Sequence, residues 1–108
     1  MKRFRNKKHL AYIRTLRCAV SSYACSAFIE AHHLLRPWDG VRGMGMKALD
    51  TNAIPLCQHH HRELHKFGNE ERFFEHMGYN GDYGKALAKR LWIDSPIHGD
   101  SALCARGR

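Results

Sequence analysis

Acidic side chains are missing from the start of this sequence: no aspartate or glutamate precedes Glu30. Seven lysines and arginines lie within the first seventeen residues, whereas the charges of the remaining chain nearly balance. The formal net charge of the 108 residues is +8. A basic segment of this kind favours a polyanionic partner, because neutralising phosphates releases counterions and supplies affinity that does not depend on sequence. A basic tail that only keeps the chain in solution is the alternative interpretation.

Long hydrophobic runs are also missing. Arg14 and Arg17 interrupt the one candidate, LAYIRTLRCAV, so we expect neither an export signal nor a membrane span. A cytoplasmic location is then expected, where thiols stay reduced. The four cysteines are therefore predicted to be metal ligands or free thiols rather than disulfides.

The sequence is short, and it has no internal repeat or low-complexity segment. Its apolar fraction of 44% argues against global disorder and suits one small domain, whose stability a bound metal would raise. We expect a flexible basic arm at residues 1–7, one domain at residues 8–96 and a flexible tail at residues 97–108.

Turn and cap residues divide the domain into short elements. Pro37 and three glycines predict a loop before residue 50, Gly68 ends a helix, and Asn69 is a candidate N-cap for the next helix. The prediction is an α+β fold with these elements: a helix that follows the arm and ends near Cys18, strands at 28–35 and 51–57, and helices at 58–67, 70–77 and 83–92.

Two groups of histidines carry the candidate chemistry. His61 and His65 are four residues apart on the predicted helix 58–67, so both imidazoles project from one face and can bind one ion. His32 lies at the end of the first strand and supplies a third ligand if that strand packs against the helix. Three imidazoles leave positions for water and a phosphate oxygen, as a catalytic ion requires.

His33 has a different expected role. Neighbouring side chains on a strand point to opposite sides, so His32 and His33 cannot easily bind the same ion. His33 is then free to take a proton from water.

These residues resemble the HNH endonucleases, also called His-Me finger or ββα-metal nucleases. The resemblance covers roughly residues 29–66 and rests on the pair in EAHH, on Asn52 in TNAIPLC and on HRELH, with nine residues from Asn52 to His61. It implies a small ββα-metal (HNH) finger with flanking α-helices, in which His32, His61 and His65 hold one divalent ion. It also implies that His33 is the general base and that Asn52 orients its imidazole through a hydrogen bond.

The wider chain, about residues 8–96, is similar to small phage and prophage HNH proteins, which implies a bacterial or phage-infected cell. Three neutral imidazoles favour zinc, nickel, cobalt or manganese over magnesium. Magnesium stays a candidate, because related nucleases with fewer histidines are commonly supported by it.

A second, structural zinc site is a further candidate, with Cys18, Cys25, Cys57 and His60 as its ligands. Many HNH domains use two CxxC pairs for such a site, whereas this chain has C-x6-C and a second pair that ends in histidine. Buried free thiols are therefore the alternative. His60 has phosphate contact as a second candidate role. His59 is assigned to solvent. The remaining histidines, His9, His76 and His98, are interpreted as surface or internally satisfied residues, and Cys104 as a free thiol.

Basic residues near these motifs are candidate contacts to nucleic acid, although solvation alone accounts for each of them equally well. They are Arg36, Arg42, Lys47, Arg62 and Lys66.

Taken with the resemblance, the sequence predicts a metal-dependent endonuclease that hydrolyses DNA phosphodiester bonds. Two alternatives stay open: a non-catalytic, zinc-stabilised nucleic-acid-binding module, and a recombination factor that nicks only with a partner protein. A homodimer that cuts both strands is a further open alternative.

Overall fold

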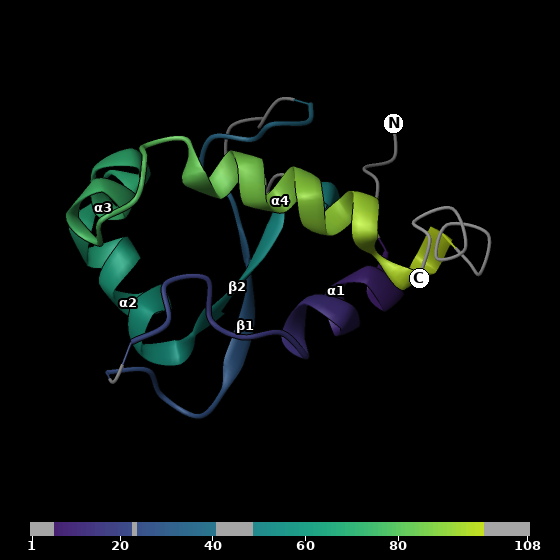
Figure 1. Ribbon diagram of the computed structural model, residues 1–108, viewed down its shortest axis with the longest axis horizontal. Helices are drawn as coiled ribbons and strands as arrows, with labels where there is room; N and C mark the ends of the chain where they lie inside the picture. The colour runs from purple at the N-terminus through teal and green to yellow at the C-terminus, as the bar shows by residue number, and fades with distance from the viewer. Residues whose placement is uncertain (1–5, 23, 41–48, 99–108) are drawn as a thin grey trace.

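Two antiparallel strands form the centre of the molecule, and four α-helices lie around them (Figure 1). The computed structural model describes residues 6–22, 24–40 and 49–98. The combination of a two-stranded antiparallel sheet with four α-helices confirms the predicted α+β class. The elements in chain order are α1 (Lys7–Arg14), β1 (Ile29–His33), the 3-10 turn η1 (Asp50–Asn52), β2 (Ala53–Cys57), α2 (Gln58–Phe67), α3 (Glu70–His76), α4 (Tyr83–Asp94) and the 3-10 turn η2 (Pro96–His98).

The register of the two strands fixes which side chains face each other. Ile29 at the start of β1 pairs with Cys57 at the end of β2, and His33 at the end of β1 pairs with Ala53. Every residue of β2 is buried, which suits a strand that is packed on both faces. A backbone hydrogen bond of 2.8 Å from Ala19 to Pro55 adds the segment after α1 to the free edge of β2.

Helix α2 follows β2 without a loop. Its N-cap is Cys57, whose sulfur accepts a hydrogen bond from the backbone N–H of His60. Its C-cap is Gly68, which has a left-handed φ of 78° that glycine adopts at no steric cost. The predicted bounds of this helix are therefore confirmed, as is the role of Asn69, whose side chain caps α3.

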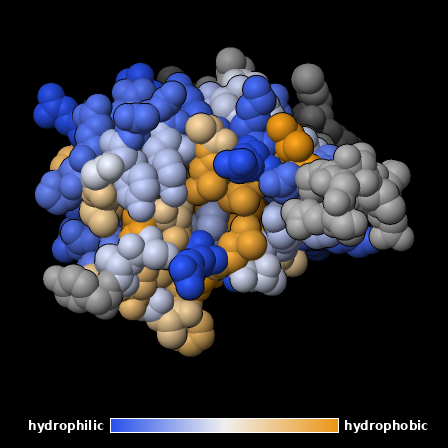
Figure 2. Space-filling model, viewed as in Figure 1, coloured by the Kyte–Doolittle hydropathy of each residue, from blue (hydrophilic) through white to orange (hydrophobic). Residues whose placement is uncertain are grey.

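The core lies where α2, α3 and α4 meet the strands. Its largest fully buried side chains include Ile54 and Leu56 from β2, Leu64 from α2, and the adjacent Phe73 and Phe74 from α3. In Figure 2 the hydrophobic side chains visible on one face gather near its middle, and hydrophilic side chains cover much of the rest. Within the described part of the chain, every helix is too short or too polar to span a bilayer.

Helix α1 differs from its prediction at both ends. It begins at Lys7 with Asn6 as its N-cap, so these two residues of the expected arm are ordered in the helix. It ends at Arg14 rather than near Cys18, because the hydroxyl and backbone N–H of Thr15 both bond to the carbonyl of Tyr12. Residues 1–5 and 99–108 of the expected arm and tail lie outside the described residues, and so does Cys104.

His9 is not a surface residue. The alternative, an internally satisfied histidine, holds for only one of its two ring nitrogens. Its ring is fully buried, with Nδ1 2.9 Å from the hydroxyl of Ser95. Among the described residues, Nε2 has no hydrogen-bond partner. His76 and His98 are exposed.

Gly84 in α4 provides a test of this packing. A methyl group there would lie 2.7 Å from Cε2 of Phe74 and 3.1 Å from Cδ2 of Leu34, and both of these side chains are buried. We expect Gly84→Ala to lower the free energy of unfolding by roughly 1–3 kcal/mol through overpacking, although alanine normally favours a helix. Urea unfolding measures this change.

The matched control is Ala86→Gly at an exposed position of the same helix. It should cost only the helix propensity, about 0.5–1 kcal/mol. A Gly84→Ala protein more stable than the wild type would contradict the described contact between α4 and α3.

Candidate metal centres

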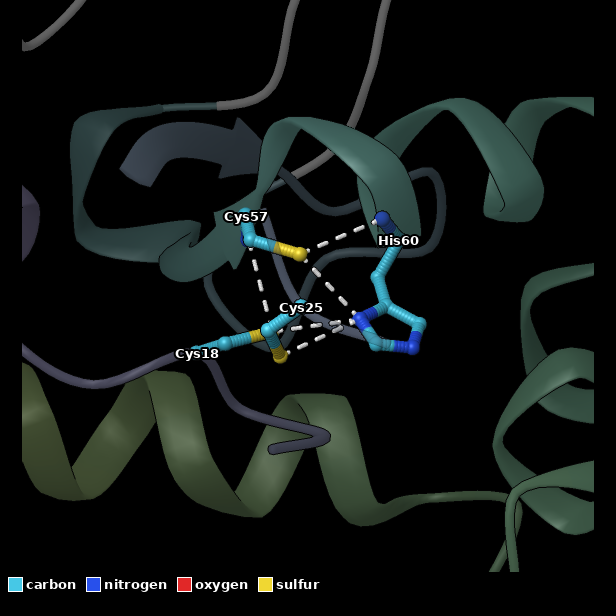
Figure 3. Close-up of side chains that lie close together, drawn as sticks. All are labelled: Cys18, Cys25, Cys57 and His60. Atoms are coloured by element: carbon cyan, nitrogen blue, oxygen red, sulfur yellow. Dashed lines mark hydrogen bonds between the residues drawn. The ribbon is translucent and has the colours of Figure 1, made fainter. Parts of the chain in front are cut away.

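Three cysteines and one histidine converge beside the start of α2 (Figure 3). Cys18 comes from the segment after α1, Cys25 from the segment before β1, and Cys57 and His60 from the junction of β2 and α2. Nδ1 of His60 lies 3.2 Å from the sulfur of Cys57, 3.5 Å from that of Cys25 and 3.7 Å from that of Cys18. In a tetrahedral zinc site this separation is about 3.6 Å, because Zn–S is near 2.3 Å and Zn–N near 2.0–2.1 Å.

The protonation of these thiols is uneven. Burial raises the pKa of Cys57, but hydrogen bonds from His60 and Ser26 outweigh burial and lower the pKa to about 6. Burial raises the pKa of Cys18 to about 12. Cys57 therefore supplies one thiolate at neutral pH, and a bound cation would favour deprotonation of its neighbours.

This Cys3His cluster can hold a metal ion such as zinc. Its members are the four residues proposed from the sequence, and the three cysteines are free of disulfides. Cys18, Cys57 and His60 are buried, as in a closed structural site. His60 therefore lies inside this cluster rather than on the surface as a phosphate contact, whereas the neighbouring His59 is exposed, as predicted.

A second group contains the three imidazoles of His32, His61 and His65, whose candidate ligand atoms lie within 4.8 Å of one another. In a tetrahedral site with Zn–N near 2.0–2.1 Å, two ligand nitrogens lie about 3.4 Å apart. His32 is buried at the end of β1, His61 is intermediate and His65 is exposed. This histidine centre is therefore open on one side, unlike the Cys3His cluster.

A cavity of about 240 Å³ lies on that open side. Its lining includes the ligand candidates His61 and His65 together with Arg62 and Glu30. A guanidinium beside a candidate cation site suits an anionic group such as a phosphate.

Two carboxylates contact the histidine centre. Oε2 of Glu70 lies 2.7 Å from Nε2 of His32, and Oε1 of Glu30 lies 2.6 Å from Nδ1 of His61. Burial lowers the pKa of His32, so its ring is neutral at neutral pH. Neither glutamate was predicted from the sequence. Glu30 could have been found, because it precedes His32 by two residues and therefore shares its face of the strand.

His33 lies outside this group, as expected for the neighbour of His32 on a strand. Its Nε2 lies 2.7 Å from Oδ1 of Asp50, which is buried, and the other oxygen of Asp50 accepts a 2.6 Å hydrogen bond from the backbone N–H of Asn6. Asp50 was not predicted from the sequence, because its partner lies 17 residues earlier in the chain.

The predicted hydrogen bond from Asn52 to His33 is not formed, because the side chain of Asn52 bonds to other groups among the described residues. Oδ1 of the fully buried Asn52 accepts from the backbone N–H groups of Trp38 and Asp39 at 2.7 and 3.2 Å, and Nδ2 donates to the carbonyl of Asp39 at 2.9 Å. These bonds use the amide to hold the turn after β1. Asn52 therefore supports the chain that follows His33, while Asp50 contacts the ring itself.

The predicted nucleic-acid contacts lie in different places. Arg36, Arg62 and Lys66 are exposed, and Lys66 forms a 3.7 Å ion pair with Glu63. Of these, Arg62 lines the cavity beside the histidine centre. Arg42 and Lys47 lie outside the described residues.

Comparison with known proteins gives the family of the chain. The model of the family described as "Protein of unknown function (DUF968)" matches residues 1–90. The chain belongs to the DUF968 family. Over 64 residues this DUF968 chain is 36% identical to "Uncharacterized protein YdfU" of Escherichia coli (strain K12). That region is 59% of the chain and only 17% of the length of YdfU. No solved structure matches the chain significantly.

Adjacent histidines provide a test of the Cys3His cluster. We expect His60→Ala to lose one zinc per chain and to lower the melting temperature by roughly 10 °C or more, since 1 kcal/mol shifts a domain of this size by about 4–8 °C. His59→Ala, the exposed neighbour, should keep the zinc and the melting temperature of the wild type. Elemental analysis and thermal unfolding measure the two quantities. Equal zinc content in both variants would contradict the ligand role of His60.

Proposed function

We propose that this protein is a metal-dependent endonuclease of the HNH type, which hydrolyses DNA phosphodiester bonds. In this proposal β1, β2 and α2 form the ββα-metal finger, and α1, α3 and α4 flank it. The observation that carries the proposal is the position of His33. It follows a member of the histidine centre directly in the chain, stays outside that centre, and has its ring held by a buried carboxylate.

Asp50 determines which ring nitrogen of His33, the proposed base, carries the proton. A carboxylate only accepts hydrogen bonds, so in the neutral ring of His33 Nε2 carries the proton and Nδ1 carries the lone pair. That lone pair is the group that takes a proton from water. The positive charge that then develops on the imidazole is stabilised by the adjacent carboxylate of Asp50, the arrangement by which an aspartate supports a catalytic histidine elsewhere.

His32, His61 and His65 are the residues that would hold the ion. A divalent ion in this place supplies positive charge against the phosphate and the leaving 3′ oxygen. Because the donors are neutral imidazoles, zinc, manganese and nickel suit the site better than magnesium.

The charge of the protein favours a nucleic acid as substrate. The formal net charge is +8, and α1 adds the exposed Lys7, Lys8 and Arg14 to the basic start of the chain. Arg62 is exposed and lines the cavity beside the histidine centre, where it can contact a phosphate.

A zinc-stabilised nucleic-acid-binding module is the second candidate, and the Cys3His cluster favours it equally. The two functions differ in their need for the histidine centre. A binding module has no use for a solvent-accessible set of imidazoles or for a base that is held by Asp50, whereas hydrolysis requires both.

The decisive experiment compares the wild type, His33→Ala and His59→Ala on supercoiled plasmid DNA with Mn²⁺ or Zn²⁺. We expect His33→Ala to lose cleavage by roughly 10²-fold or more while its fold and metal content persist, because general-base catalysis contributes about 10²–10⁴-fold. His59→Ala, which changes an exposed histidine, should cleave like the wild type. Unchanged cleavage by His33→Ala would contradict the assignment of the base, and binding without cleavage by the wild type would favour the binding module.

Asp50→Asn tests the support of that base. Since the backbone N–H of Asn6 faces one oxygen of Asp50, an asparagine there would turn its amide oxygen to Asn6 and its NH2 group to His33. Nε2 would then have to accept, and the proton would move to Nδ1. We expect cleavage to fall by roughly 10²-fold or more, as other wrong-tautomer variants do.

The control for this variant is Asp39→Asn, which removes the same charge from an aspartate that contacts Thr51 instead of His33. The measurement is the cleavage rate of Asp50→Asn and of Asp39→Asn at saturating metal. If both variants cleave equally fast, His33 does not depend on Asp50.

A further inference from the structure

Glu70 is a buried carboxylate with no cationic side chain beside it among the described residues. It is 7% exposed and begins α3, outside the strand–strand–helix unit that contains the histidine centre. A buried charge is costly unless hydrogen bonds satisfy it. The partners that satisfy Glu70 therefore indicate its role.

Its partners come from two groups. The backbone N–H of Leu35 donates to both oxygens at 3.1 Å, and that of Arg36 donates to Oε1 at 3.3 Å. On the other side, Oε2 lies 2.7 Å from Nε2 of His32. The backbone donors fix the carboxylate in place, so it cannot turn away from His32.

This arrangement sets the tautomer of His32. A carboxylate has no proton to donate, so Nε2 of His32 must be the donor. A neutral imidazole carries one N–H, and the lone pair is therefore on Nδ1, the nitrogen free to bind an ion. Glu70 is absent from the group of converging ligand atoms, so its role is to act through His32.

We propose that Glu70 is a positioning residue of the histidine centre, which fixes His32 in the tautomer that presents Nδ1 to a divalent ion. This inference rests on the proposed function, because it takes His32, His61 and His65 as the ligands. A carboxylate behind a metal-binding histidine holds the ring and raises its basicity, and loss of such a partner weakens metal binding by roughly 10–100-fold. Through the contact of Glu70 with His32, helix α3 also belongs to the metal centre.

Glu70→Gln is the sharpest variant. Oε1 accepts from both backbone N–H groups, whereas Oε2 accepts from Leu35 alone. The glutamine would therefore keep its oxygen at the position of Oε1 and turn its NH2 group to His32. Nε2 of His32 would then accept, and the proton would occupy Nδ1. The shape of the side chain is kept, while the ligand nitrogen is blocked.

The matched control is Glu71→Gln. Glu71 is the next residue in the first turn of α3, so its change removes the same charge from the same helix terminus. An effect that came only from the helix dipole would appear in both variants. Glu70→Asp, which keeps an acceptor-only group, should recover part of the loss.

The test titrates Co²⁺ into protein that carries one equivalent of zinc, in the Cys3His cluster, and follows binding to the free histidine centre by calorimetry and visible absorption, without DNA. We expect the dissociation constant of Co²⁺ to rise roughly 10–100-fold in Glu70→Gln and to stay unchanged in Glu71→Gln. Nitrogen-15 NMR of the metal-free histidine centre should show the Nε2–H tautomer of His32 in the wild type and the Nδ1–H tautomer in Glu70→Gln.

The outcomes separate the two proposals. If His61→Ala binds Co²⁺ as the wild type does, the ion site itself is wrong and the proposed function fails with it. If His61→Ala abolishes binding but Glu70→Gln binds like Glu71→Gln, only the role of Glu70 is overturned. Should Glu70→Gln fail to fold, an Nδ1–H tautomer of His32 in the wild type would still overturn the inference.

Discussion

The pairing of β1 with β2 is the constraint on which both candidate centres depend. Because β2 leads into α2 without a loop, the register that sets Ile29 opposite Cys57 also fixes the start of α2 relative to β1. The first turn of α2 then brings His60 to the cysteines, and the next positions bring His61 and His65 to His32. A slip of one residue would turn His32 to the other face and separate it from α2.

Two buried carboxylates each contact one of two adjacent histidines. Among the described residues, Asp50 and Glu70 are the buried acidic side chains, and each lies 2.7 Å from one ring of the His32–His33 pair. Each is also bound from behind by backbone N–H groups, which keeps it aimed at its ring. In the proposed nuclease, alternation along β1 separates ligand from base, and these carboxylates determine which nitrogen of each ring has the lone pair.

Local chemistry explains which features the sequence could predict. Helix α2 was predictable because Gly68 ends it and its histidine spacing is helical, and that spacing also places His61 and His65 on one face. The more distant ligand candidates, Cys18, Cys25 and His32, were added from the resemblance and from the expected packing of the first strand against this helix. Asp50 and Glu70 were not predictable, because their partners depend on tertiary packing across 17 and 38 residues. The hydrogen bond expected from Asn52 to His33 came from a resemblance. In the structure the buried side-chain amide of Asn52 instead bonds to the backbone of Trp38 and Asp39.

The central claim is that the histidine centre holds an ion against a DNA phosphate within reach of His33. Anomalous diffraction from crystals of the zinc-loaded His33→Ala protein with duplex DNA and Mn²⁺ tests it most directly. The account predicts zinc in the Cys3His cluster and Mn²⁺ bound by Nδ1 of His32, Nε2 of His61 and a ring nitrogen of His65, with a phosphate oxygen completing its coordination. Mn²⁺ bound elsewhere, or DNA bound with no phosphate at the histidine centre, would contradict it.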